Sequence, residues 1–437
     1  MWPYHPDLLA TPVPRYTSYP TAAEFGDDVG PADLADAIST AMGEVSLYIH
    51  IPFCEKICWY CGCNTAAANR KQRLDSYMEA LYREIALVAA LLPANARVTR
   101  IAFGGGSPNA LAPVDFVRLF DHLVIKFPLD SPTVSIELDP RTLTSEWQSV
   151  LRGIGATHAS MGVQTFAPDL QEAIGRVQPI EMIDKGVKIL RGAGITSMNF
   201  DLMYGLPGQE LADLEESLDY ARRFGADRIA LFGYAHVPGM FPRQRQIDAS
   251  DLPGNEMRFK MAAMGHDRLV AAGYHAIGFD HFALPDDPLA MASRAGRLRR
   301  NFQGFTEDQA PALIGLGASA ISSFPGLLAQ NEKNSGRYRM SLSQGELPAV
   351  RGKRRSTEDR RCGAIIEELL CRGRARVDAA SQQAAIDRLT PYLEAGLCSI
   401  DNGAVVIASH GVPYARSIAA AFDPYRRQSA RQFSTAI

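Results

Sequence analysis

The chain is 437 residues long, with 46% hydrophobic and 21% charged residues, a composition typical of a globular enzyme with a large core. Its formal net charge of −3 gives no electrostatic reason to expect nucleic acid or an anionic membrane as a partner. The longest apolar stretch, around residues 85–94, is too short to span a bilayer. Because the chain has an odd number of cysteines, seven, and no secretory leader, we expect a cytoplasmic protein.

The first predicted strand, residues 45–51, leads into a loop that carries Cys54, Cys58, Cys61 and Cys63. With the spacing C-x3-C-x2-C, three thiolates on one tight loop can bind a [4Fe–4S] cluster and leave its remaining iron open to a small molecule. A structural zinc site is the alternative, but zinc sites usually join cysteine pairs across a longer spacer and close every position. Spacing and ligand softness favour the cluster, and Cys63 is not expected to bind iron.

Strands and helices are predicted to alternate along the first half of the chain. Further strands are predicted at 98–103, 134–138, 158–163, 198–203 and 228–233, with amphipathic helices between them, for example at 74–92 and 113–126. A strand–helix unit repeated in this way indicates an α/β protein with a parallel sheet and helices outside it. Because six units are fewer than the eight of a closed TIM barrel, we predict an open three-quarter (β/α)6 barrel.

Polar or glycine-rich residues come at the end of every predicted strand. The carboxyl ends of parallel strands form the reactive face of a barrel, so the sequence predicts a functional site there. In chain order these are the cysteine loop, the turn Gly104-Gly105-Gly106-Ser107-Pro108, Glu137, Gln164, Asp201 and Tyr234-Ala235-His236.

Tyr48 and His50 alternate with isoleucines on the first strand, so both are expected on one face of it. Their side chains either face the functional site or form a hydrogen-bonded pair in the core. Glu137 can accept the two hydroxyls of a ribose, and a salt bridge to Arg141 is its alternative role.

We divide the chain into an N-terminal segment (1–43), a catalytic barrel with an extension (44–340) and a mostly helical C-terminal domain (341–437). A loop around residues 335–352 is predicted to separate the last two. The C-terminal domain contains a predicted helix from Thr357 and a strand pair around Asp401-Asn402-Gly403, an order that resembles a winged helix. Its charge balance favours packing over the open side of the barrel rather than DNA binding.

The cysteine motif resembles the signature of the radical SAM superfamily, in which the open iron binds S-adenosylmethionine. The longer run from Tyr48 to Asn64 is similar to one family in particular, the oxygen-independent coproporphyrinogen III oxidases, also called coproporphyrinogen III dehydrogenases. The resemblance covers nearly the whole chain. It includes PRYTSYPT at 14–21, the glycine turn, MGVQ at 161–164, DLMYGLP at 201–207, NFQG at 301–304, and Phe433, Ser434 and Ile437.

The resemblance implies a role for each matching residue. Tyr48, His50 and Cys63 would take part in the chemistry, although a packing thiol is an equal reading of Cys63. Ser107 and Asn109 depart from the usual threonines, and Tyr60 replaces a phenylalanine but keeps a flat ring. The implied cluster ligands are Cys54, Cys58 and Cys61. A first S-adenosylmethionine would contact Tyr48, Tyr60, Gly104, Gly105, Gly106, Ser107 and Glu137. A second would contact Gln164, Arg176 and Asp201, and Ala235 and Ile321 would line the cofactors.

Arg15 and Tyr16 belong to the N-terminal part of the resemblance. A substrate with four propionates calls for arginine and tyrosine donors, so segment 14–21 is a candidate lid over the barrel. A proline-rich leader lying on the surface is its alternative.

The implied reaction is the oxidative decarboxylation of the propionates on rings A and B of coproporphyrinogen III to vinyl groups. The 5′-deoxyadenosyl radical from S-adenosylmethionine would start it, and protoporphyrinogen IX for haem synthesis would result. An unidentified electron donor and acceptor are also implied, and we expect a monomer. The alternatives are a related haem-binding chaperone, which typically lacks Cys63 and segment 14–21, a radical SAM methyltransferase acting on haem, and a zinc-stabilised DNA-binding regulator.

Overall fold

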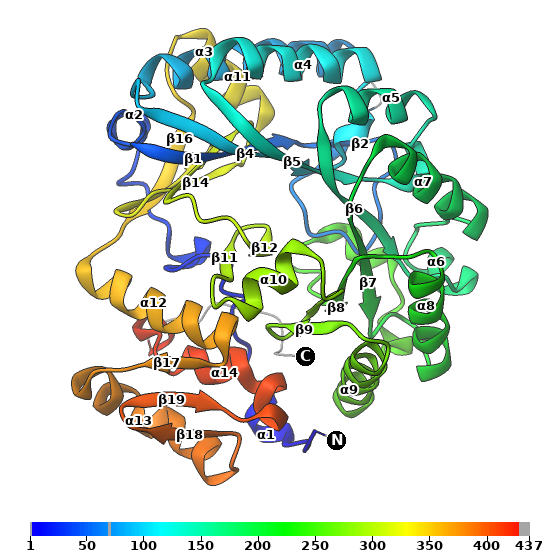
Figure 1. Ribbon diagram of the computed structural model, residues 1–437, viewed down its shortest axis with the longest axis vertical. Helices are drawn as coiled ribbons and strands as arrows, with labels where there is room; N and C mark the ends of the chain where they lie inside the picture. The colour runs from blue at the N-terminus through cyan, green and yellow to red at the C-terminus, as the bar shows by residue number, and fades with distance from the viewer. Residues whose placement is uncertain (1, 69–70, 428–437) are drawn as a thin grey trace.

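The computed structural model describes residues 2–68 and 71–427 (Figure 1). Phe433, Ser434 and Ile437, which belong to the sequence resemblance, lie outside the described residues. The main sheet has twelve strands in the order β16-β15-β14-β13-β1-β4-β5-β6-β7-β8-β10-β9. None of the helices in the described part of the chain combines the length and apolar character needed to cross a membrane.

The six predicted strands form the centre of this sheet, and each pairs in parallel with the next. Side chains alternate across each strand, so Val45, Leu47 and Ile49 face the outer helices while Ser46 and Tyr48 face the concave side. The prediction of a parallel α/β sheet is confirmed. The strands are β1 (Gly43–Ile51), β4 (Ala96–Gly105), β5 (Leu129–Leu138), β6 (Ala156–Gln164), β7 (Ser197–Tyr204) and β8 (Arg228–Gly233).

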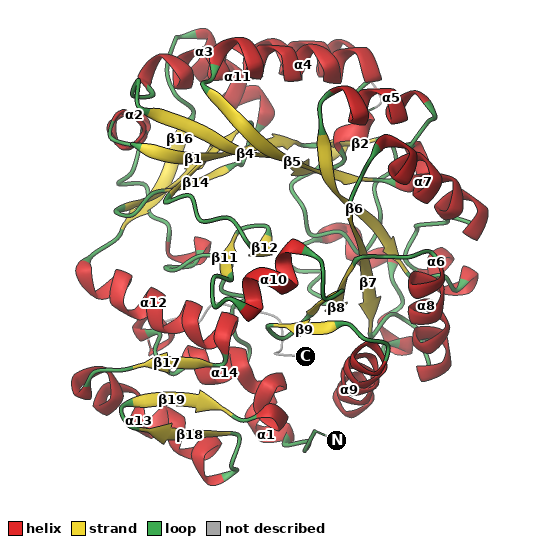
Figure 2. Cartoon of the chain, in the orientation of Figure 1, coloured by secondary structure: helices red, strands yellow, loops and turns green. Residues whose placement is uncertain are grey.

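Helices lie along the outer side of the curved sheet (Figure 2). Helix α4 (Pro113–Lys126) shows how the sequence builds them. It has Pro113 in its first turn and buries Phe116, Leu119 and Leu123, which are spaced so that they share one face. The outer helices are α3 (Lys71–Leu91), α4 (Pro113–Lys126), α5 (Glu146–Gly153), α6 (Pro168–Ala173), α7 (Ile180–Ala193), α8 (Leu211–Arg223) and α9 (Asn255–Ala271).

Both edges of the parallel sheet are extended. Next to β1 lies β13 (Ala312–Leu316), which is also parallel, followed by the antiparallel strands β14 (Ile321–Ser323), β15 (Leu327–Asn331) and β16 (Ala349–Arg354). Next to β8 lie the antiparallel strands β10 (His281–Ala283) and β9 (His275–Ile277). The large sheet is therefore mixed, and only its central part follows from the strand–helix repeat.

The prediction of a loop around residues 335–352 is wrong, because α11 (Ser335–Ser343) and β16 occupy most of this range. The side chain of Asn334 caps α11 by accepting hydrogen bonds from the backbone of Gly336 and Arg337. Strand β16 reads Ala-Val-Arg-Gly-Lys-Arg, which has too few apolar side chains for a sequence-based strand prediction.

The concave side of the sheet is partly filled by the chain itself. Helix α10 (Pro288–Arg294) and the hairpin of β11 (Arg299–Asn301) and β12 (Gly304–Thr306) lie there (Figure 2). Two short strands of the cysteine loop, β2 (Phe53–Cys54) and β3 (Ala66–Ala67), pair in parallel nearby.

The C-terminal region has its own three-stranded sheet, ordered β17-β19-β18. Helix α12 starts with the capping box of Ser356 and Asp359, as predicted at Thr357, and the predicted strand pair turns at Asn402 and Gly403. Both have positive φ, as this hairpin turn requires. The elements are α12 (Thr357–Arg372), β17 (Arg374–Arg376), α13 (Ala379–Glu394), β18 (Cys398–Asp401), β19 (Ala404–Ile407) and α14 (Ala415–Ala420).

The N-terminal segment packs against this C-terminal region. It contains α1 (Pro6–Leu9) and, further along, α2 (Pro31–Ser39), and Figure 1 shows α1 beside the C-terminal elements. The hydroxyls of Tyr16 and Tyr19 donate to the carboxylate of Asp423, at 2.9 and 3.2 Å. The two ends of the described chain are thus joined by buried hydrogen bonds.

A buried carboxylate joins α3 to the extension of the sheet. Glu84 accepts hydrogen bonds from the Gly317 backbone (2.7 Å), from Asn331 (2.7 Å) and from the Tyr338 hydroxyl (2.5 Å). Next to it, the Tyr77 hydroxyl donates to the carbonyl of His50 (2.7 Å) on β1. These bonds fix the turn after β13 relative to the end of β1.

We expect the substitution Glu84→Ala to lower the free energy of unfolding by about 3 kcal/mol, because it leaves buried donors without an acceptor. Tyr338→Phe, which removes one of these bonds, should cost about 1 kcal/mol. Urea denaturation measures both. Equal stability of Glu84→Ala and the unaltered protein would show that the network does not hold this turn.

Candidate functional site

The parallel strands line a cavity of about 310 Å³ on the concave side, which extends from Ser197 and Arg228 at the starts of β7 and β8 to Glu137 near the end of β5. Its lining includes Glu137 from β5 and Asp201 from β7, together with Phe305 from the inner hairpin. Residues of separate strands that are distant in sequence therefore line one cavity. Other lining residues are Ser160, Asn199, Phe232, His281 and Gln303.

The glycine turn after β4 passes close to three neighbours. A Cβ atom at Gly104 would lie 2.6 Å from the Glu137 carboxylate, and one at Gly105 would lie 2.5 Å from the His50 ring. At Gly106 it would lie 2.5 Å from the Phe53 carbonyl oxygen. Gly105 also has a φ of +112°, which favours glycine. Glycine is therefore required at these positions by the packing of the chain itself.

Glu137 faces the cavity and accepts a hydrogen bond from the Gly105 backbone at 3.2 Å. Burial raises the pKa of Glu137 to about 7, and the nearby carboxylate of Asp201 adds to this rise. The alternative prediction for Glu137, a salt bridge to Arg141, is wrong, because Arg141 pairs with Asp139 at 2.6 Å.

Tyr48 and His50 lie on the concave face of β1, as their alternation predicts. The Tyr48 hydroxyl is 3.1 Å from His50 Nδ1, and the Ser319 hydroxyl is 3.2 Å from His50 Nε2. Burial lowers the pKa of His50 to about 4, so the ring is neutral near pH 7. Ser319, which has a φ of +66° in the turn after β13, gave no sequence signal.

The cysteine loop is bordered by two guanidinium groups. Cys58 Sγ accepts hydrogen bonds from Arg141 (3.2 Å) and Arg176 (3.1 Å). A hydrogen bond from Cys63 lowers the pKa of the Cys61 thiol to about 6, whereas burial raises the pKa of Cys54 to about 12. In the parts of the chain that the structure describes, no three acidic, histidine or cysteine side chains are grouped as ligands of one metal ion.

Asp139 holds both guanidinium groups in place. Its carboxylate lies 2.6 Å from Arg141 and 3.4 Å from Arg176. Burial would raise the pKa of Asp139, but the two arginines outweigh it and hold that pKa below its usual value. Asn109 connects this group to the glycine turn, since its amide donates to the Asp139 carbonyl at 2.8 Å and Ser107 bonds to its side chain.

Of the residues predicted for a second cofactor, Gln164 ends β6, Arg176 lies between α6 and α7, and Asp201 lies within β7. Asp201 accepts hydrogen bonds from Ser160 (3.0 Å) and Asn199 (2.8 Å), and burial raises the pKa of Asp201. Arg176 donates to the Gly162 carbonyl at 2.6 Å, and Gln164, with a φ of +70°, approaches the same glycine. Arg176 is therefore not the surface charge that a lone arginine usually is.

Gln244, which sequence reasoning missed, joins the cysteine loop to the end of β8. Its amide donates to the carbonyls of Tyr60 (2.9 Å) and Ala235 (3.0 Å), two of the predicted cofactor neighbours. Ile321 begins β14 on the opposite side of β1 and is half-buried. Tyr16 is not brought to the cavity, because its hydroxyl faces Asp423.

Comparison with known proteins gives consistent results. The radical SAM superfamily matches residues 48–221. The chain is 39% identical to the oxygen-independent coproporphyrinogen III oxidase of Bradyrhizobium diazoefficiens over 94% of each chain. It is 38% identical to that of Pseudomonas aeruginosa, over 96% of this chain and 95% of the relative. The solved coproporphyrinogen III oxidase of Escherichia coli, described as a radical SAM enzyme, matches with a TM-score of 0.91 and 34% identity over 97% of this chain and 99% of that one.

We expect the substitution Asp139→Asn to lower the free energy of unfolding by about 3–5 kcal/mol, because it leaves two buried guanidinium groups without their carboxylate. Asp115→Asn is the matched control, since Asp115 pairs with Arg118 at the surface and should cost less than about 0.5 kcal/mol. Denaturation in urea compares the two variants. An equally small cost for both would contradict a structural role of Asp139.

Proposed function

The chain belongs to the family of the oxygen-independent coproporphyrinogen III oxidases, within the radical SAM superfamily, and from this premise we propose its reaction. It converts two propionate side chains of coproporphyrinogen III, on rings A and B, to vinyl groups and yields protoporphyrinogen IX for haem synthesis. Each propionate loses a hydrogen atom, one electron and CO2. The observation that carries the proposal is the identity of about 38% to these oxidases along more than nine-tenths of the chain.

The chemistry of the cysteine loop fits the [4Fe–4S] cluster that the family implies. Cys54, Cys58 and Cys61 would hold it, and the guanidinium groups of Arg141 and Arg176 beside Cys58 would offset the negative charge of the thiolates. When bound, the cluster and S-adenosylmethionine would supply a 5′-deoxyadenosyl radical.

We propose that the strand ends orient two molecules of S-adenosylmethionine. Tyr60 and Ser107 join the backbone of Gly104, Gly105 and Gly106 in contacting the first, and the Glu137 carboxylate accepts its ribose hydroxyls. Supporting this, Glu137 already accepts a hydrogen bond at the glycine turn and faces the cavity. Gln164, Arg176 and Asp201 would contact the second, and Ala235 and Ile321 would line both.

Tyr48, His50 and Cys63 are the proposed participants in the chemistry. A neutral His50 ring, hydrogen-bonded to Tyr48 and Ser319, can pass a proton without adding charge to the cavity. Holding substrate and cofactors against one another would bring the reacting groups together and keep water and oxygen from the radical.

The proposed domain organisation follows from this function. A three-quarter barrel at 44–340 would carry the chemistry, and residues 341–437 would form a winged-helix-like domain that packs over its open side. Segment 1–43 would contribute a lid, in which Arg15 contacts the Gly233 carbonyl at the end of β8. We propose a cytoplasmic monomer that requires an external electron donor and an electron acceptor.

Anaerobic assay of the reconstituted protein with a reductant, S-adenosylmethionine and coproporphyrinogen III is expected to yield protoporphyrinogen IX and 5′-deoxyadenosine by mass analysis. Cys58→Ala should lose the iron, the brown absorbance and all product, because it removes a cluster ligand. Cys63→Ala, on the same loop, should keep its iron. Cofactor cleavage without decarboxylation would refute the proposed substrate.

The affinity for S-adenosylmethionine should rise about tenfold between pH 6 and pH 8, because Glu137 has a pKa of about 7 and only its carboxylate can accept both hydroxyls. Glu137→Gln should bind more weakly and lose this part of the pH dependence. Calorimetric titration of the reconstituted protein at several pH values measures both. An identical pH profile in the variant would assign the titration to another group.

A further inference from the structure

A histidine–aspartate pair lies beside the cavity that Glu137 and Asp201 line. His281, on β10, lines the same cavity, and its Nδ1 is 2.6 Å from the carboxylate of the adjacent Asp280. Each of the two side chains is only 12% exposed. The chemistry proposed above does not use this pair.

Asp280 determines which nitrogen of the histidine ring carries the proton. Burial would raise the pKa of Asp280, but its pairing with the adjacent histidine and the charges of Arg300 and Arg15 outweigh burial and hold that pKa below its usual value. A carboxylate only accepts hydrogen bonds, so Nδ1 is the donor of the pair. In the neutral ring Nε2 is then an acceptor, and within residues 2–68 and 71–427 no group donates a hydrogen bond to it.

Neighbouring side chains hold the His281 ring in this position. Phe232 and Phe305 make T-shaped contacts with it, with ring centroids 5.6 and 5.4 Å away. Gly304 lies beside Nε2, where a Cβ atom would be 3.5 Å from this nitrogen, and its φ of +118° favours glycine. The ring is therefore fixed, and the lack of a side chain at Gly304 leaves Nε2 uncovered on this side.

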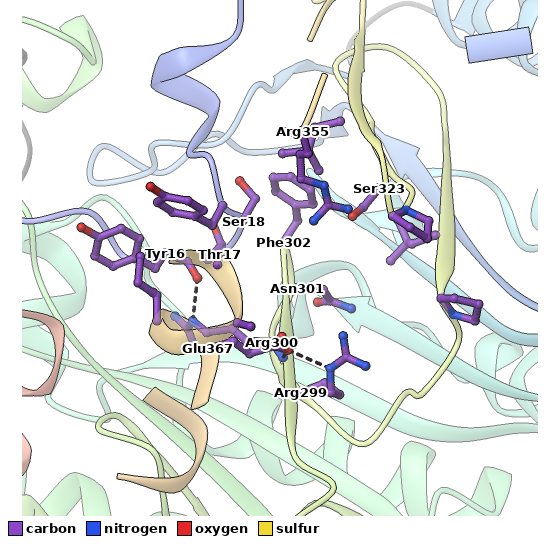
Figure 3. Close-up of a pocket in the computed structure, with 18 of the residues that line it drawn as sticks. Tyr16, Thr17, Ser18, Arg299, Arg300, Asn301, Phe302, Ser323, Arg355 and Glu367 are labelled. Carbon is purple, nitrogen blue, oxygen red and sulfur yellow. Dashed lines mark hydrogen bonds and ion pairs between the residues drawn. The ribbon is translucent and has the colours of Figure 1, made fainter. Parts of the chain in front are cut away.

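The hairpin of β11 and β12 separates this cavity from a second one. Figure 3 shows Asn301 and Phe302 of the hairpin at the second cavity, which has a volume of about 400 Å³. Gln303 and Phe305 line the first cavity, and Thr306 lines both. A ligand in the first cavity is therefore bounded by the hairpin and by β10.

The groups that share this cavity with Nε2 favour a ligand that donates hydrogen bonds. Glu137 and Asp201 present carboxyl oxygens, and the buried Oδ1 of Asn199 has no partner among the described residues. The two arginines of the lining, Arg100 and Arg228, already form ion pairs with carboxylates. A further anion beside Glu137 and Asp201 is disfavoured by like charge, whereas an uncharged N–H group is not.

We propose that His281, oriented by Asp280, binds the tetrapyrrole substrate by accepting a hydrogen bond from a pyrrole N–H at Nε2. The proposal rests on the function proposed above and adds a substrate contact to it. Each pyrrole ring of coproporphyrinogen III carries an N–H, whereas the ribose hydroxyls of S-adenosylmethionine are already assigned to Glu137. Asp280 acts through His281 and is a positioning residue.

The test measures binding without turnover, in the reconstituted holoenzyme with S-adenosylmethionine but no reductant. Anaerobic ultrafiltration gives the Kd of coproporphyrinogen III, and calorimetry gives that of S-adenosylmethionine. His281→Phe, which fills the space of the ring but has no acceptor, should weaken binding of coproporphyrinogen III about tenfold, as expected for losing one buried hydrogen bond. The same variant should bind S-adenosylmethionine as the unaltered protein does.

Three further variants separate hydrogen bonding from packing. His281→Gln keeps an acceptor oxygen and should bind coproporphyrinogen III within about threefold of the unaltered protein. Asp280→Asn should weaken binding about fivefold although the histidine is intact, because an amide can donate to Nδ1 and favour the tautomer with its proton on Nε2. Asp267→Asn is the matched control and should change neither affinity, since Asp267 lies 3.1 Å from the adjacent His266 but is 65% exposed on α9.

Oxidised coproporphyrin III distinguishes the pyrrole nitrogens from the carboxylates of the ligand. It has the same four carboxylates, but only two ring nitrogens keep a proton, and these point into the centre of a flat macrocycle. His281→Phe should therefore change its affinity less than about twofold. Equal weakening of the oxidised and reduced ligands would overturn the pyrrole contact.

Unchanged binding of coproporphyrinogen III by His281→Phe would overturn the proposal and leave the proposed reaction intact. Weaker binding of S-adenosylmethionine by this variant would also overturn it, because the ring would then act on the cofactor or on the fold. Selective loss of coproporphyrinogen III binding, where the unaltered protein forms no protoporphyrinogen IX, would support the contact and refute the reaction.

Discussion

The parallel pairing of six strands is the constraint on which the rest of the structure depends. Parallel strands place all their carboxyl ends at one edge, so the cysteine loop after β1, the glycine turn after β4 and the carboxylates of β5 and β7 meet there. The side-chain alternation then sends apolar residues to the outer helices and polar residues inward. One backbone arrangement thus provides both the core and the polar lining of the cavity.

Buried charge is the second requirement of this site, and the chain supplies its own compensation. Asp139 balances Arg141 and Arg176 next to Cys58, while no cation of residues 2–68 and 71–427 pairs with Glu137, which keeps a raised pKa. The first arrangement gives a rigid, positive border to the cysteine loop, and the second leaves a carboxylate available to a ligand. The surroundings therefore make Asp139 a fixed structural carboxylate and leave Glu137 a carboxylate that can act on a ligand.

Buried hydrogen bonds join the N-terminal segment to the C-terminal region. Asp423 accepts hydrogen bonds from Tyr16 and Tyr19, and Arg15, just before them in the chain, donates to the Gly233 carbonyl at the end of β8. The C-terminal region is thus connected, through the N-terminal segment, to the end of β8.

The sequence by itself determined the six central strands, the cysteine loop, the glycine turn and the helix that starts at Thr357, because each depends on alternation, spacing or capping between near neighbours. Only the tertiary structure decided that Arg141 pairs with Asp139 rather than with Glu137, that β13 to β16 extend the sheet, and that Arg15 lies near Arg416. Such contacts join residues from separate elements or, for Arg141, choose between two acidic residues that both lie near it in the sequence. Local sequence patterns do not predict these contacts, because the packing of the chain decides which side chains meet.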